Sequence, residues 1–147
     1  MTHEDAGKYA AKHTPGTNPD EKLAAAVKTK VVNNGITCGA TEAIAKDLGL
    51  AMAAVGQTAD LLELKIHKCQ LGLFGWGAEQ KHGKDIRAVE TVAEDLKDVL
   101  STTAREGVVT CAELWGIASR LGIERKKASS ACETLNLKIR GCQLGTF

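Results

Sequence analysis

Apolar residues recur at helical spacing near the start of the chain. Leu23, Val27 and Val31 follow one another at intervals of four residues, which is typical of the buried stripe of an amphipathic helix. The preceding Asn18-Pro19-Asp20-Glu21 supplies a capping asparagine, a proline suited to the first helical position and acidic residues for the positive end of the helix dipole. Asn33-Asn34-Gly35 predicts the end of this helix.

Shorter elements follow this helix. Ile36–Cys38 is rich in β-prone residues, and Thr37 is suited to cap a helix that runs to Leu48. Gly49 predicts the end of that helix, and a further helix is expected over about Ala51–Leu62. The pattern indicates two short helices joined by a glycine turn.

The second half of the chain repeats this pattern. Residues 36–74 align with residues 109–147 without a gap, and 15 of the 39 aligned positions are identical. A repeated segment retains what its fold requires, so we expect two copies of one structural unit. In the second copy Thr110 and Glu113 form a capping-box pattern at the start of a helix, and a further helix is expected over about Glu124–Leu135.

Each copy ends on a Leu-Lys-Ile-x-x-Cys-Gln-Leu-Gly string that does not alternate as one strand would. A two-residue turn at His67-Lys68 or Arg140-Gly141 restores the alternation and places Ile66 opposite Cys69 on a buried side. The string therefore predicts a β-hairpin, and a single bulged strand is the alternative.

The remaining segments set the domain boundaries. Residues 1–18 lack periodicity and are expected to form a mobile N-terminal arm, with a helical turn around Tyr9–Lys12. Residues 19–75 form the first predicted unit, residues 76–84 a glycine-rich linker and residues 85–147 the second unit. The second unit is expected to open with a long amphipathic helix, whose stripe is Ile86, Val89, Ala93, Leu96 and Leu100.

This order of elements resembles the winged helix-turn-helix family. The residues that carry the likeness are the Leu48-Gly49-Leu50 and Leu121-Gly122-Ile123 turns and the string after each second helix. The Lys-Ile-x-x-Cys-Gln-Leu-Gly-x-Phe string also resembles small conserved prokaryotic proteins of unassigned function. The likeness implies a mainly α fold with small β-hairpins (α+β), built as two tandem winged-helix-like units related by internal duplication. It further implies that the second helix of a pair reads a major groove, although such units also serve in protein association.

The two copies differ in charge, although the whole chain has a net charge of only +1. Residues 37–74 carry three basic and four acidic residues, whereas residues 110–147 carry six basic and three acidic ones. The first copy has a smooth apolar helix face over Ala51–Gln57, which favours packing against a second copy or another protein. Basic residues at a helix start, with small hydroxyls after them, favour contact with DNA, although a solvated surface helix is the plain alternative. The candidate contacts are Arg125, Lys126, Lys127, Ser129, Ser130, Lys138 and Arg140.

Four cysteines occupy matched positions in the two copies: Cys38, Cys69, Cys111 and Cys142. A redox-sensitive disulfide within each unit, a four-thiolate zinc site and an iron–sulfur site are the functional alternatives. There is no C-x-x-C spacing, and the predicted hairpin turns Cys69 and Cys142 inward. The pattern favours small buried hydrophobic residues and no cofactor.

The sequence contains no phosphate loop, nucleotide fingerprint, zinc-protease helix or nucleophile elbow, so we expect no catalytic activity. It also has no signal-peptide pattern and no apolar run long enough to span a membrane, so a cytoplasmic protein is expected. The leading hypothesis is DNA binding by the second unit and association through the first. A protein-interaction adaptor without DNA binding is the alternative, and a thiol or metal sensor is a weaker one.

Overall fold

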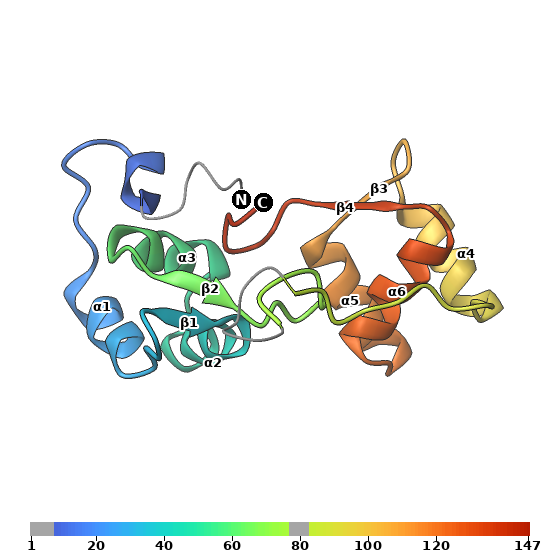
Figure 1. Ribbon diagram of the computed structural model, residues 1–147, viewed down its shortest axis with the longest axis horizontal. Helices are drawn as coiled ribbons and strands as arrows, with labels where there is room; N and C mark the ends of the chain where they lie inside the picture. Colours follow the sequence, from blue (N-terminus) through green and yellow to red (C-terminus); the bar gives the residue numbers. More distant parts are fainter. Residues whose placement is uncertain (1–7, 77–82) are drawn as a thin grey trace. The chain divides into compact units, whose positions relative to one another are not determined.

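The computed structural model describes residues 8–76 and 83–147, and these divide into two compact units (Figure 1). Unit 1 is Met1–Cys69 together with Gln143–Phe147, and unit 2 is Gln70–Cys142. The described part of each unit holds three α-helices and a two-stranded ladder. The prediction of a mixed α+β fold is therefore confirmed at this level.

Unit 1 is a three-helix bundle with a short strand pair. Helix α1 packs against α2 and α3, and a short 3₁₀ helix, η2, packs against α3. Leu23, Val27, Ile36, Val55 and Ala59 fill the core between them. The elements are η2 (Tyr9–Lys12), α1 (Glu21–Lys28), β1 (Gly35–Thr37), α2 (Cys38–Leu48), α3 (Met52–Leu61) and β2 (Lys65–His67).

The described part of unit 2 has three α-helices and two strands in the same order as those of unit 1. Helix α4 packs against both α5 and α6, and Leu100, Val109, Leu114, Ala128 and Cys132 are buried between them. Each of its helices and strands begins 73 residues after its counterpart in unit 1. The elements are α4 (Glu94–Thr103), β3 (Val108–Thr110), α5 (Cys111–Leu121), α6 (Arg125–Thr134) and β4 (Lys138–Arg140).

The helix caps expected from sequence are present. The Thr37 hydroxyl accepts a hydrogen bond from the backbone N–H three residues on, and Thr110 and Glu113 form a complete capping box. Gly49 and Gly122 end α2 and α5, each with a φ of 65°. Glycine adopts this left-handed conformation without a Cβ penalty, so both breaks follow from local chemistry.

The predicted hairpins are wrong. Strand β2 pairs with β1 in parallel, with Ile36 opposite Ile66, and β4 pairs with β3 in the same way. Parallel partners need a long crossover connection, which the two intervening helices provide. Lys68 and Gly141 follow the strands with φ values of 49° and 67°, so the chain turns away there and no second hairpin strand forms in the described residues.

Two helices differ from their predicted bounds. Asp20 rather than Asn18 caps α1, because its carboxylate accepts the Leu23 N–H at 2.9 Å. Helix α4 begins only at Glu94, so the predicted long helix is reduced to its second part. Residues 86–93 include four β-branched side chains, which lower helix propensity, and Val89 is held outside the helix by hydrogen bonds to α6.

The segments that follow β2 and β4 each belong to the unit that is formed mainly by the other copy. We call residues 70–74 the central strap and residues 143–147 the C-terminal strap; the first belongs to unit 2 and the second to unit 1. The predicted domains, 19–75 and 85–147, instead place the central strap in the first unit and the C-terminal strap in the second. Residues 77–82 of the predicted linker and residues 1–7 of the predicted arm lie outside the described residues.

Candidate nucleic-acid interface

Arg125 lies in the first turn of α6, where it stacks on an aromatic ring. Its guanidinium carbon is 3.6 Å from the centroid of the Trp115 ring, which projects from α5. A cation over the face of an indole is attracted by the negative charge of the ring face. Arg125 is half-buried, so this stacking fixes its side chain against unit 2.

Lys126 is also engaged within unit 2. Its ammonium group forms an ion pair with Asp85 and stands 3.5 Å from the centroid of the Trp76 ring. The positive charge of Lys126, predicted to contact a phosphate, is therefore compensated by the Asp85 carboxylate of the same unit. Two of the three basic residues at the start of α6 thus have contacts inside the protein.

The segment before α4, residues 83–89, contacts α6 at Glu133 and Thr134. Lys84 forms an ion pair with Glu133. The Thr134 hydroxyl accepts the Val89 N–H and donates to the Val89 carbonyl, at 2.8 Å in each case. The Thr134 side of α6 is therefore occupied by the chain of the same unit.

The two predicted hydroxyl contacts are less accessible than the sequence indicated. Ser129 has an exposed fraction of 0%, so this structure does not support its prediction as a nucleic-acid contact. Ser130 is half-buried. Helix α6 contacts α4, α5 and β4, and this wide contact buries Ser129 beside Ala128 and Cys132.

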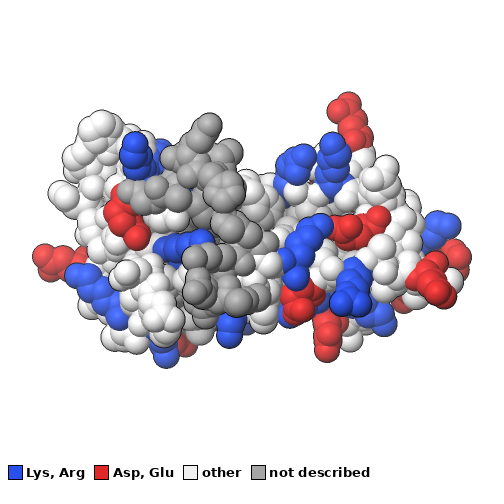
Figure 2. Space-filling model, in the orientation of Figure 1, with Lys and Arg blue, Asp and Glu red and all other residues white. Residues whose placement is uncertain are grey.

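Three predicted cations stand in solvent: Lys127, Lys138 and Arg140. None of them has an ion-pair partner among residues 8–76 and 83–147. Lys138 and Arg140 flank the half-buried Ile139 on β4, so the alternation of a strand directs both to one face. On the face drawn in Figure 2, Lys and Arg side chains are interspersed with Asp and Glu rather than forming one uninterrupted patch.

Comparison with the equivalent position in unit 1 gives a local cause for the exposure of Arg140. Its counterpart His67 is buried against Gly35, where an added Cβ would lie 2.0 Å from His67 Nε2. Unit 2 has Val108 at the position of Gly35. A valine side chain fills the space that a buried ring would need, and the longer Arg140 extends into solvent.

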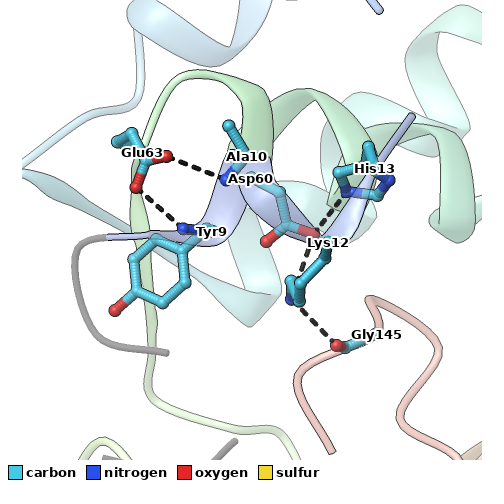
Figure 3. A network of polar contacts seen from close by, with 7 residues as sticks. All are labelled: Tyr9, Ala10, Lys12, His13, Asp60, Glu63 and Gly145. Carbon is cyan, nitrogen blue, oxygen red and sulfur yellow. Dashed lines mark hydrogen bonds and ion pairs between the residues drawn. The ribbon is translucent and has the colours of Figure 1, made fainter. Parts of the chain in front are cut away.

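Unit 1 covers its own third helix with the N-terminal arm (Figure 3). Glu63 accepts the backbone N–H groups of Tyr9 and Ala10 at 2.9 and 2.8 Å. Asp60 Oδ2 lies 2.9 Å from His13 Nε2 and 3.1 Å from Lys12 Nζ (Figure 3). The predicted helical turn is confirmed, and residues 9–13 of the predicted arm are held against α3 and Glu63 by these contacts.

The sequence did not indicate that both units carry such an arm. Asp60 and Glu133 occupy equivalent positions on α3 and α6, and each pairs with a lysine that precedes the first helix of its unit. Alignment of residues 8–13 at the same offset matches only Lys8 with Lys81. The repeat therefore gave no signal for this contact.

The apolar face predicted over Ala51–Gln57 borders an open groove of about 480 Å³ in unit 1. Leu50 on this groove is 41% exposed. Apolar surface of this kind at a concave site is typical of association surfaces. The apolar lining comes from Leu23, Leu48, Leu50, Ala54 and Leu61.

The five cysteines, all within the described residues, form no disulfide. Cys38, Cys69 and Cys111 are buried, whereas Cys142 is half-buried. No group of three or more His, Cys, Asp or Glu side chains in the described residues is arranged to hold a metal ion, so the four-cysteine alternative gains no support. Burial, with a smaller contribution from the charge of Glu133, raises the pKa of the Cys132 thiol to about 11.

Among the described residues, no helix combines the length and apolarity needed to cross a membrane. No family model matches the chain, and neither a curated protein nor a solved structure matches it.

Proposed function

We propose that this protein binds nucleic acid through unit 2, and that the contact is made to the phosphate backbone. The observation that carries the proposal is the uncompensated charge of Lys127, Lys138 and Arg140, which stand exposed on α6 and β4. Lysine and arginine side chains in solvent are the groups that neutralise phosphates.

The proposal includes two helix-turn-helix units that arose by duplication. It is supported by the 73-residue offset between all equivalent helices and strands and by the matching glycine breaks. The proposal does not include contacts between α6 and the edges of the bases, because Ser129 is buried and Arg125 and Lys126 have partners within unit 2. Binding by phosphate contacts alone discriminates little between sequences.

The salt dependence of binding tests the number of phosphate contacts. Three contacts on duplex DNA predict a slope of roughly −3 for the logarithm of the binding constant against the logarithm of salt concentration, since each contributes about −0.9. The measurement is fluorescence anisotropy with a labelled mixed-sequence duplex, beginning at low salt.

A matched pair of variants separates the proposed surface from net charge. Lys127→Glu, Lys138→Glu and Arg140→Glu together are expected to abolish binding. The control reverses three exposed lysines of unit 1, Lys22, Lys28 and Lys30, and changes the net charge equally. The control is expected to keep most of the affinity. Equal losses in both variants, or no binding by the wild type at low salt, would refute the proposal.

A second candidate function is protein association through unit 1, and the groove beside α3 favours it. Leu50 is exposed on this groove, whereas the exposed Val32 does not line it. Leu50→Arg is expected to release a bound partner in a pull-down, and Val32→Arg is expected to retain it. Retention by both variants would exclude the groove as the binding surface.

A further inference from the structure

The straps carry the most strongly repeated sequence of the chain and lie in the units of the opposite copies. Gln-Leu-Gly-x-Phe occurs at residues 70–74 and again at residues 143–147. Leu71 of the central strap is 0% exposed and Leu144 of the C-terminal strap is 4% exposed. Each unit therefore buries a leucine supplied by the other repeat.

The C-terminal strap fits a closely matched slot on α3 of unit 1. A Cβ added at Gly56 would lie 2.4 Å from the Leu144 carbonyl oxygen and 2.8 Å from its Cα. The strap backbone thus passes directly over a helical glycine, and any larger residue there would displace it. Thr146 is also buried, so the contact extends beyond the leucine.

The arm closes the other side of the slot. Lys12 Nζ donates a hydrogen bond to the Gly145 carbonyl oxygen at 3.2 Å while it pairs with Asp60 (Figure 3). Gly145 has a φ of 77°, a conformation in which other residues are strained. The slot is therefore specific for a segment that has glycine directly after the buried leucine.

We propose that this slot is a peptide-binding site and that it accepts the Gln143–Phe147 strap of a second copy of the chain. The strap is joined to unit 2 through Cys142, and unit 1 is incomplete without it. Its contacts with Gly56 and Lys12 are the same whichever molecule supplies it. A molecule's own strap is favoured only by its effective concentration, and a molecule whose own strap is defective must take one from a second copy.

Two complementary variants of the full chain test this exchange. Gly56→Ala closes the slot and leaves the strap intact, whereas Leu144→Asp spoils the strap and leaves the slot intact. Each variant alone lacks a matched slot and strap and is expected to be monomeric. An equimolar mixture is expected to give a heterodimer of twice 15.5 kDa by size-exclusion chromatography with light scattering.

The control mixes Leu144→Asp with Gly116→Ala. Gly116 is also helical, but an added Cβ there meets nothing within 4 Å, so this variant keeps its own slot and its own strap. It is expected to give at least tenfold less heterodimer than Gly56→Ala, and an excess of a synthetic Gln-Leu-Gly-Thr-Phe peptide is expected to dissociate the heterodimer.

Three results would overturn the exchange: no heterodimer from two variants that keep native circular dichroism, a homodimer of Gly56→Ala, or equal heterodimer with Gly116→Ala. If Leu144→Asp does not fold, Leu144→Ala takes its place with the same expected results.

Discussion

Gly56→Ala and Gly116→Ala are the same substitution in two helices, yet the structure predicts opposite effects on stability. Alanine favours a helix interior over glycine by about 1 kcal/mol. At Gly116 the added methyl group meets no neighbour, so unit 2 should gain up to about 1 kcal/mol. At Gly56 the methyl group collides with the backbone of Leu144 at 2.4 Å, and the strap must leave its slot.

The loss at Gly56 exceeds the gain in helix propensity. Exposing the Leu144 side chain costs about 1.5–3 kcal/mol, and the hydrogen bond from Lys12 to Gly145 is lost as well. Gly56→Ala should therefore destabilise unit 1 by about 1–2 kcal/mol after the propensity gain of about 1 kcal/mol is subtracted. The two variants should differ by about 2–3 kcal/mol in the free energy of unfolding.

The positions of the aromatic residues allow each unit to be followed. Trp76 and Trp115, the two tryptophans of the chain, both belong to unit 2, so tryptophan fluorescence reports on that unit. Far-ultraviolet circular dichroism reports on both. Gly56→Ala should lower the midpoint of the dichroism transition by roughly 5 °C or more and leave the fluorescence midpoint unchanged. Equal stabilisation by both substitutions would refute the account of the slot.

Three further perturbations have defined outcomes. Between pH 9 and pH 11 the Cys132 thiol ionises in the unfolded chain but stays neutral in the folded one. The wild type should therefore lose about 2–3 kcal/mol of stability over this range relative to Cys132→Ala, measured by urea unfolding. Parallel pH profiles of the two proteins would contradict this. Thr110→Ala removes the capping box and should cost about 1–2 kcal/mol, seen as a lower fluorescence midpoint; an unchanged midpoint would show that the cap adds nothing. Asp60→Asn weakens the docking of the arm and should speed tryptic cleavage after Lys12, whereas Asp47→Asn on the exposed side of α2 should not.

Local chemistry was readable from the sequence. Thr110 with Glu113 and the left-handed Gly122 fix the two ends of α5 through contacts within a few residues. The inward positions of Ala128 and Cys132 followed from helical spacing in the same way. These predictions were correct because they depend on contacts within a few residues and not on packing by distant segments.

Pairing between distant segments was not readable. The strings around Ile66 and Ile139 correctly indicated strands, but their apolar pattern does not identify the strand that pairs with them. The docked arm and the buried Ser129 were missed for a related reason. Both depend on which elements pack against α3 and α6, and polar residues such as Ser129 and Asp60 read as solvent-facing in sequence.

The position of the C-terminal strap has a consequence for folding during synthesis. Helices α1 to α3 leave the ribosome early, but the leucine that completes their core is made after nearly the whole of the second repeat. Contacts between residues as distant as Gly56 and Leu144 raise the contact order and slow folding. Until residue 144 emerges, the growing chain has an incomplete first unit, a state in which early domains are prone to aggregate or to recruit chaperones.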